Sequence, residues 1–450
     1  MKSIFRFLCI LVLTILVGND FAYAQGQRKI SFIRDAEIES ALRLYATPLF
    51  QAAGLSPEAV KIFLVKDKSL NAFVAGGQKL FMNTGLLMEA KNAGQVIGVI
   101  AHETGHIAGG HLSRIQAALD KSSAQSIAAF ILGGAAAVLG QGDLAQAIII
   151  GGQTLGTNSF LRFTRTQENS ADQAAMRLLE GTHQSAQGLY EFMAILEEQE
   201  LVSPQYQDAY MRTHPVTRSR MTALRAHMAN SAYSRTPVAP ELQAIHRRLR
   251  AKLYAFLEPT SRTMRRYKKS DRSIEARYAR AVAYHKSAKL DKALKTMSGL
   301  LTEHPKDPYF LELMGQILFE SGRVRDSIPY YTAAVKVAPS SALIRGELAH
   351  AQIETNNPAL LQSAISNLRA ALRVEREIPS TWRALATAYG RQKNNLQASL
   401  ALAEEALLLN KKTDAIHFAT RAKKGAKEGT PAWLQADDIL AAAKRLKAPQ

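Results

Sequence analysis

The sequence predicts a mainly α-helical chain with a small antiparallel β-sheet near its beginning and a stack of paired helices in its second half. Apolar residues recur at helical spacing through most of the chain. Two short apolar runs flank a Gly-Gly pair, which is typical of a β-hairpin. The second half contains a repeat with a period of 34 residues. The chain has 450 residues, more than one compact core usually holds, so at least two domains are expected.

Residues 1–24 have the features of a secretory signal. A positively charged start precedes an apolar core from Phe7 to Val17, and a small-x-small cleavage site ends at Ala24. We therefore predict Sec export, cleavage after Ala24 and a location in the periplasm, with an uncleaved anchor as the alternative. The only cysteine, Cys9, lies inside this signal. The mature chain would have no thiol, so metal ligands must come from histidine and carboxylate side chains.

The first domain is expected to begin with a helix and a small sheet. Residues 31–54 carry apolar side chains at helical spacing, and 61–65 form a predicted strand. Residues 71–75 and 78–82 flank Gly76-Gly77 as a predicted hairpin. Two interpretations of this hairpin remain open. It is either a scaffold or an edge to which a substrate peptide adds as an extra strand.

The next predicted helix, residues 86–111, contains an H-E-x-x-H motif. His102 and His106 are four residues apart, so both imidazoles can point at one cation from the same helix face. Glu103 would lie beside the open coordination position, where it can accept a proton from water. This arrangement is what a zinc hydrolase needs, provided that a third ligand comes from elsewhere. His111 lies off that face and is interpreted as a helix-end residue.

Residues 124–155 are the least polar part of the mature chain. Glycine-containing breaks divide this stretch into two apolar halves, and neither reaches the roughly 20 residues that a membrane-spanning helix needs. We predict a buried or interfacial helical hairpin. A mobile flap over a cleft, a shallow membrane dip and a true span remain as alternatives.

A further predicted helix, residues 163–180, contains the sequence E-x-x-A-D. Glu168 and Asp172 are one turn apart on one face. Such a pair usually belongs to a solvated helix face, but its position after the H-E-x-x-H helix suggests a metal site. Glu168 would be the third ligand. Asp172 would accept the second ring N–H of a ligand histidine and so fix its tautomer.

An H-E-x-x-H motif followed about 60 residues later by E-x-x-A-D resembles the gluzincin peptidases typified by the CAAX prenyl proteases and HtpX. The resemblance implies a zincin-like metalloprotease domain with one Zn²⁺ held by His102, His106 and Glu168, and with Glu103 as the catalytic base. Members of the family also carry a His-Pro pair, here His214-Pro215. The resemblance implies that His214 either stabilises the oxyanion or closes the zinc site as a fourth ligand.

The same resemblance places Arg220 among the catalytic residues, where it would support the same pocket as His214. The resemblance covers roughly residues 30–225. The most similar branch of the family is the secreted one, which carries helical repeats at the carboxyl end. Membrane-embedded processing of prenylated proteins, the activity of another branch, needs several spans that this sequence lacks.

Between residues 247 and 277 the chain is dense in lysine and arginine, within an overall net charge of +19. Nucleic acid is a common partner for such a run, but a secreted chain meets little of it. We expect no nucleic-acid binding. Anionic lipid headgroups, acidic peptide or plain solvation of a helix face fit the run better.

Beyond this run the chain repeats. Pro305 and Pro339 lie 34 residues apart, as do Ala281 and Gly315, and 34 is the tetratricopeptide period. The stretch that begins at Trp382 resembles the start of such a repeat. We predict three or four helical pairs between 275 and 445 in an α-solenoid, with an insertion near 356–358. A plain helical bundle is the alternative.

Together these features predict a signal peptide at 1–24, a metalloprotease domain at 25–235, a basic linker or helix at 236–274 and repeats at 275–450. The resemblance implies a periplasmic zinc endopeptidase that acts in quality control or assembly of outer-membrane proteins. Its partners would be protein or peptide substrates, unfolded outer-membrane proteins and their assembly machinery, with peripheral membrane contact left open. The alternative is a repeat-based chaperone or adaptor with a latent metal site.

Overall fold

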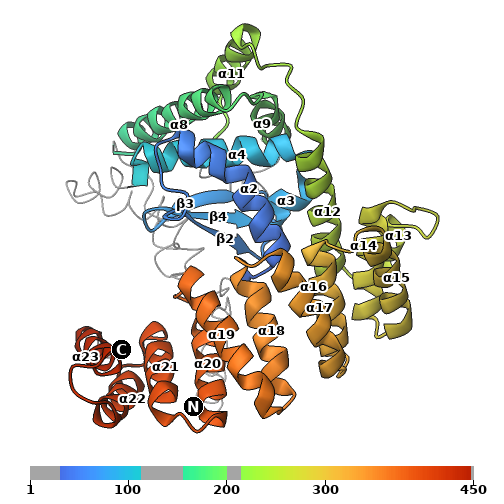
Figure 1. Ribbon diagram of the computed structural model, residues 1–450. Helices are drawn as coiled ribbons and strands as arrows, with labels where there is room; N and C mark the ends of the chain where they lie inside the picture. The colour runs from blue at the N-terminus through green and yellow to red at the C-terminus, as the bar shows by residue number, and fades with distance from the viewer. Residues whose placement is uncertain (1–30, 113–155, 200–213, 447–450) are drawn as a thin grey trace, which may run out of the picture. The chain divides into compact units, whose positions relative to one another are not determined.

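The computed structural model describes residues 31–112, 156–199 and 214–446 (Figure 1). The predicted signal and the apolar stretch at 124–155 lie outside these ranges. The chain divides into two compact units. Unit 1 comprises Met1–Ile33, Pro48–Glu89 and Gly94–Thr236, and unit 2 comprises Arg34–Thr47, Ala90–Ala93 and Pro237–Gln450.

The sheet of unit 1 is small and mixed. The strands are β1 (Phe32–Ile33), β2 (Lys61–Val65), β3 (Ala72–Ala75) and β4 (Lys79–Asn83), in the order β1-β2-β4-β3. The β3–β4 hairpin is antiparallel as predicted, but β2 and β4 are parallel, so the prediction of a purely antiparallel sheet was wrong. The chain crosses from β2 to the edge of the sheet before it returns through the hairpin, and this crossing makes β4 run in the direction of β2.

The hairpin turn requires glycine. Gly76 and Gly77 have φ of 56° and 88°, a region that L side chains rarely adopt. Stacked rings fix the register of the strands: Phe81 stacks on Phe63 at 5.0 Å and on Phe73 at 4.9 Å between ring centroids. Among the described strands β1 and β3 are the two edges, and whether a peptide adds at β3 stays a prediction.

The helices of unit 1 differ from the predicted ones mainly at one break. The predicted helix over 86–111 is two helices, because the chain leaves helical geometry at residues 90–92. The second helix begins at Ala93, whose N–H is accepted by the side-chain oxygen of Gln243 at 2.9 Å. The helices are α2 (Ala36–Ala52), α3 (Thr84–Glu89), α4 (Ala93–Ala108), α8 (Gly156–Gly181), α9 (Gln187–Gln199) and α11 (Arg218–Asn230).

Glycines on α4 allow its neighbours to approach closely. A Cβ at Gly105 would lie 2.7 Å from the carbonyl oxygen of Ala171 on α8, and one at Gly98 would lie 2.6 Å from the backbone nitrogen of Leu189 on α9. Both distances are shorter than packed atoms tolerate. The helix is buried on all sides from Val99 to Thr104, so it forms the centre of unit 1.

Unit 2 contains five consecutive helical pairs among its described residues, rather than the three or four predicted. The two helices of each pair pack on each other, and the second helix of a pair packs on the first helix of the next pair. The helices are α12 (Pro240–Leu257), α13 (Thr260–Arg266), α14 (Ile274–Lys286), α15 (Leu290–Glu303), α16 (Pro308–Glu320), α17 (Val324–Val337), α18 (Ala342–Glu354), α19 (Pro358–Val374), α20 (Pro379–Arg391), α21 (Asn395–Leu408), α22 (Lys412–Gly425) and α23 (Pro431–Arg445).

One repeat is longer than the others, but not because of the insertion that we predicted. The turn at 356–358 contains no insertion, and Asn356 adopts a left-handed φ of 55° there. Instead, α19 has 17 residues where α15, α17 and α21 have 14. The 34-residue spacing of Ala281 and Gly315 does mark close packing, because a Cβ at Gly315 would lie 3.0 Å from the ring of Tyr331.

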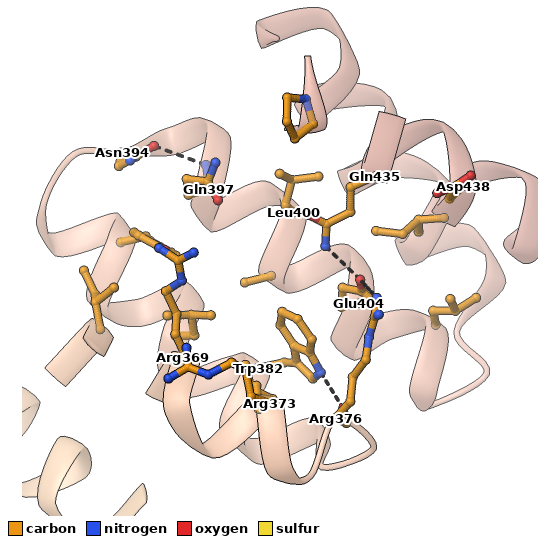
Figure 2. A pocket seen from close by; sticks show the side chains of 18 of the residues that line it. Arg369, Arg373, Arg376, Trp382, Asn394, Gln397, Leu400, Glu404, Gln435 and Asp438 are labelled. Carbon is orange, nitrogen blue, oxygen red and sulfur yellow. Dashed lines mark hydrogen bonds and ion pairs between the residues drawn. The ribbon is translucent and has the colours of Figure 1, made fainter. Parts of the chain in front are cut away.

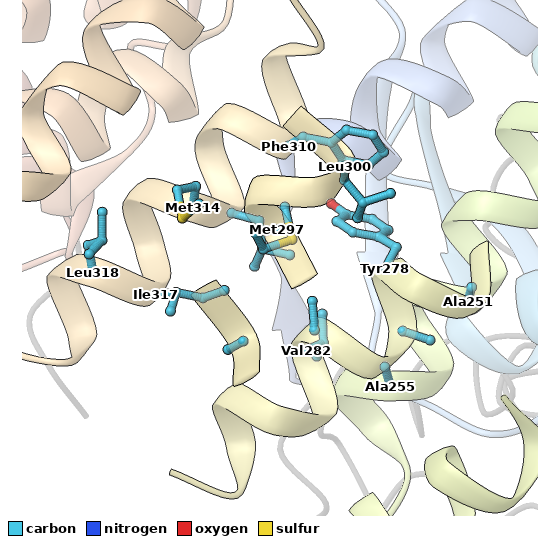
Figure 3. Packing of buried hydrophobic residues seen from close by; sticks show 14 residues of the cluster. Ala251, Ala255, Tyr278, Val282, Met297, Leu300, Phe310, Met314, Ile317 and Leu318 are labelled. Atoms are coloured by element: carbon cyan, nitrogen blue, oxygen red, sulfur yellow. The ribbon is translucent and has the colours of Figure 1, made fainter. Parts of the chain in front are cut away.

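The core of the first pairs is built around Tyr278, Met297 and Phe310 (Figure 3). The rings of Tyr278 and Phe310 meet edge-on with their centroids 5.0 Å apart. Part of α2 belongs to the same unit: Ala36 packs with Leu311 and Ile344. The repeat unit therefore contains a segment that precedes it by some 200 residues in the sequence.

The basic run, predicted as a linker or helix, is helical, and many of its cations form ion pairs. It forms α12, α13 and the start of α14. Arg247 lies 2.8 Å from Glu275, and Lys252, which is buried, lies 2.8 Å from Asp35. Many of these cations therefore neutralise carboxylates of their own unit.

The predicted fold class, mainly helical with a small sheet and a carboxyl-terminal repeat array, is confirmed. Within the residues that the structure describes, no helix is both long and apolar enough to cross a bilayer.

Candidate metal centre

Three segments that are far apart in the sequence bring four side chains to one point. His102 and His106 come from α4, Glu168 from α8, and His214 from the segment before α11. One ligand atom from each of the four lies within 4.8 Å of the others. His102, Glu168 and His214 are buried, and His106 is partly exposed.

The spacing of these atoms suits a tetrahedral metal ion. The Nε2 atoms of His102 and His106 are 3.1 Å apart, and each is 3.3 Å from a carboxylate oxygen of Glu168. His214 Nδ1 is 3.4 Å from His102 Nε2 and 3.0 Å from Glu168 Oε1. Metal–ligand bonds of 2.0–2.1 Å arranged as a tetrahedron place the ligands about 3.3 Å apart. The donor set of imidazole nitrogen and carboxylate oxygen is one that zinc accepts.

The carboxylate of Glu103 lies beside this cluster and is fully buried. In the described part of the chain neither of its oxygens has a hydrogen-bond partner, and the nearest ring nitrogen, His214 Nε2, is 3.6 Å away. Burial raises the pKa of Glu103, against the opposing effect of His214 and His102. A buried carboxylate without hydrogen bonds is costly for the fold and typical of a functional site.

Asp172 and Arg220 form a second layer around the ligands. Asp172 Oδ1 lies 2.9 Å from His102 Nδ1, so the carboxylate can hold this ring with Nε2 facing the cluster. Arg220 donates to both carboxylate oxygens of Asp172, at 2.6 and 2.9 Å, and lies 3.0 Å from Glu168. The structure thus places Arg220 against the two acids rather than against the open side of the cluster.

His111, interpreted from the sequence as a helix-end residue, belongs to the site. Its Nδ1 lies 3.0 Å from Nδ1 of His106, and the two rings meet edge-on. Gly110 has a left-handed φ of 60° just after α4, and this turn brings His111 back over the helix end. Gly109 leaves room for it, since a Cβ there would lie 2.5 Å from the His111 ring. The signal in the sequence was the Gly-Gly pair before a third histidine.

The residues of the cluster differ in how their surroundings shift their pKa values. Burial lowers the pKa of His106 to about 3, so this ring is neutral and able to donate a lone pair. Burial also opposes charge on His102, but the hydrogen bonds that its ring donates to Asp172 and Glu168 outweigh this effect and raise the pKa of His102 to about 9. Glu168 is buried as well, yet its interactions and hydrogen bonds with the neighbouring histidines hold its pKa well below the usual range.

The comparisons with known proteins agree with this geometry. The model of peptidase family M48 matches residues 33–228, and a tetratricopeptide repeat model matches residues 226–448. The first match covers all the residues of the cluster and its second layer.

Curated proteins are similar to large parts of this chain. A protein named β-barrel assembly-enhancing protease is 22% identical in Yersinia pestis and 23% identical in Escherichia coli K12, over 92% of this chain and 84% of each relative. The metalloprotease LoiP of Escherichia coli K12 is 30% identical over 43% of this chain and 72% of its own length. The chain is a metalloprotease and belongs to peptidase family M48.

Proposed function

We propose that this chain is a periplasmic zinc endopeptidase that cleaves unfolded or misassembled outer-membrane proteins. The observation that carries the proposal is the cluster of His102, His106 and Glu168 with the buried carboxylate of Glu103 beside it. The names of the similar proteins from Yersinia pestis and Escherichia coli support a role in β-barrel assembly. The repeats would hold the substrate or its assembly machinery.

In this proposal each residue has one task. A zinc ion held by His102, His106 and Glu168 would polarise the scissile carbonyl and make water a nucleophile near neutral pH. Glu103 accepts the proton of the attacking water and passes it to the leaving amine. Its lack of hydrogen-bond partners among the described residues leaves both oxygens available for this transfer.

Asp172, Arg220 and His111 position the ligands. Asp172 fixes the tautomer of His102, and His111 does the same for His106. Arg220 holds Asp172 and offsets part of the negative charge on Glu168. We therefore assign Arg220 a positioning role and not the catalytic one that the sequence suggested.

His214 would close the site at rest. Its Nδ1 lies 3.4 Å from His102 Nε2 and 3.0 Å from Glu168 Oε1, so it would take the fourth ligand position, where water or substrate would otherwise bind. Of the two roles left open by the sequence, this geometry favours the closing ligand over oxyanion stabilisation. A substrate that displaces the ring would open the site, and the freed imidazole would remain within reach of the reaction.

The remaining parts of the proposal concern the organisation of the chain. We propose that residues 1–24 direct export to the periplasm and are removed. Residues 25–235 would form the catalytic domain and 275–450 the repeats, with the helical basic segment 236–274 between them.

The test is a pair of measurements on the mature protein and on Glu103→Gln. The wild type should contain about one zinc per chain and digest casein and an unfolded outer-membrane protein, and a chelator should stop both reactions. Glu103→Gln should keep its zinc and fold but lose cleavage by at least about 100-fold, the usual contribution of a general base. Cleavage at the wild-type rate by this variant would refute the assignment.

The second candidate function, a chaperone or adaptor with a latent metal site, is favoured by the closed position of His214. Glu103→Gln tests it as well. If the protein acts chiefly by binding, this variant should still copurify with its partners and restore the function of a deletion strain. A protease should copurify with them but fail to restore function.

A further inference from the structure

The last repeats of unit 2 enclose a pocket of about 1010 Å³ (Figure 2). It is lined by α19, α20, α21 and α23 and is as large as the larger ligand sites of proteins. The earlier pairs differ, because residues Arg34–Thr47 belong to them and pack between their helices. Among the described repeats, the last ones therefore offer space for another molecule.

One side of this pocket is cationic. Arg369 and Arg373 lie along it, whereas Asp438 lies on the opposite side (Figure 2). Arg376 and Gln435 both donate to Glu404 (Figure 2). Arg376 is paired with Glu404 at 2.7 Å. Arg369 and Arg373 are exposed, and no carboxylate of the described chain pairs with either one. Like charges one helical turn apart destabilise a helix, so the fold alone gives no reason for this pair.

The spacing of the two free arginines suits an extended peptide. They are four residues apart on α19, which corresponds to a rise of about 6 Å. Side chains at positions i and i+2 of an extended chain project to the same side about 6.6 Å apart. Two carboxylates at alternate positions of such a chain could therefore each meet one guanidinium group.

The opposite wall suits the other face of the same peptide. Leu434 on α23 is 51% exposed, which is unusual for a large apolar side chain, and Ile439 lies one turn further along. Asp438 between them would repel carboxylates and so favour one orientation. Amide side chains such as Gln397 and Gln435 line the pocket and can bond to a peptide backbone.

We propose that this pocket binds an extended segment of a partner protein in which acidic and apolar residues alternate, with the acids on Arg369 and Arg373 and the apolar side chains on α23. This inference deepens the proposed function, on which it rests for the role of the repeats. Alternating segments of this kind are the sequence pattern of half-exposed β-strands before they pair.

An anionic membrane surface is the competing partner for free arginines. A membrane needs cations on an outward face, whereas these arginines flank a cavity with apolar and amide side chains across it. The structure therefore favours the peptide.

The chain offers an internal probe of the pocket. It contains two tryptophans, and Trp382 lines the pocket while Trp433 does not. In a Trp433→Phe, Glu103→Gln variant of the full mature chain, Trp382 fluorescence reports binding and no probe is cleaved. The probe is a ten-residue peptide with Asp at positions 4 and 6 and Leu at positions 3, 5 and 7. The matched peptide has Asp at positions 4 and 5, with the same charge on opposite faces.

The alternating peptide should change the fluorescence saturably, and the matched peptide should bind at least about threefold more weakly. Arg369→Gln and Arg373→Gln should each weaken binding about three- to tenfold and reduce its dependence on salt. Arg325→Gln is the control, because Arg325 is an exposed arginine of α17 outside this pocket. It should leave binding unchanged.

Equal binding of the two peptides, or equal affinity of the arginine variants, would overturn the proposal. So would phosphatidylglycerol vesicles that bind through Arg369 and Arg373 while neither peptide binds. These outcomes are independent of zinc content and casein digestion by the wild type. Failure of the pocket and failure of the peptidase assignment can therefore be told apart.

Discussion

The protein buries two groups of charged side chains, one in each unit, and the two groups balance their charge by different means. In unit 1, Glu168 and Asp172 remain ionised, because histidines and Arg220 lower their pKa values against the effect of burial. In unit 2, burial together with the nearby acids Glu347 and Asp35 raises the pKa of Glu312 well above its usual range. The first group keeps its negative charge. In the second group Glu312 takes up a proton, while Lys252 and Arg248 hold the pKa of Glu37 below its usual value.

The different protonation of the two groups of buried side chains indicates that the groups have different roles. Acids that stay ionised beside imidazole rings create a place for a cation, and a proton on His102, whose pKa is raised to about 9, competes with that cation. Acids that are protonated or paired with Lys252 and Arg248 create no such place and serve to join helices. The same residue types therefore form a reactive centre in one unit and a structural joint in the other.

The sharpest test of this contrast is the substitution of glutamate by glutamine in each group. Glu168→Gln should abolish cleavage and lower zinc affinity by more than about 100-fold, since changes in the second layer alone cost 10–100-fold. Competition with a fluorescent chelator measures the affinity, and circular dichroism controls for folding. Zinc bound with wild-type affinity by this variant would contradict the role of Glu168.

The second test concerns His111, whose ring lies against the ring of His106. His111→Leu should lower zinc affinity about 10- to 100-fold, because His106 loses the group that orients it. His111→Gln, whose side-chain oxygen can accept the same hydrogen, should recover part of the loss. His350→Leu, on an exposed face of α18, is the matched control. An unchanged affinity in His111→Leu would show that the contact is incidental.

The third test compares glycines of the two units. Gly105→Ala should destabilise the protein by about 1–3 kcal/mol and weaken zinc binding, because the new Cβ forces α4 and α8 apart. Gly346→Ala in α18 meets open space and should instead stabilise its helix by up to about 1 kcal/mol. Thermal unfolding measures both. Equal effects would mean that the helix approach at the metal centre is not tight.

The smallest expected effect is a pH dependence of unit 2. Glu312 has a raised pKa in the folded state, so folding takes up a proton and stability falls as pH rises above about 4.5. Glu312→Gln should match the wild type near pH 5 and exceed its free energy of unfolding by about 1–2 kcal/mol near pH 8.

Denaturant unfolding at the two pH values measures this difference, with a chelator present so that the metal centre does not contribute. Glu428→Gln, at an exposed position, is the control and should show no such gain. If Glu312→Gln loses stability equally at both pH values, Glu312 is ionised in the fold.

Local patterns predicted much of this molecule. The ligands on α4 follow from i, i+4 geometry, and Glu168 and Asp172 follow from a second motif at helical spacing. What was missed depends on contacts that periodicity does not encode. His111 reaches His106 only through the left-handed turn at Gly110. The break between α3 and α4 and the parallel pairing of β2 with β4 depend on partners from other segments.

The place of Arg34–Thr47 has a consequence for how the protein forms. Asp35 and Glu37 neutralise Lys252 and Arg248, which are synthesised some 200 residues later. This segment must therefore wait unpaired until the repeats emerge. For the same reason, a fragment that begins at residue 237 would bury Lys252 without Asp35 and Glu37, its two ion-pair partners from that segment.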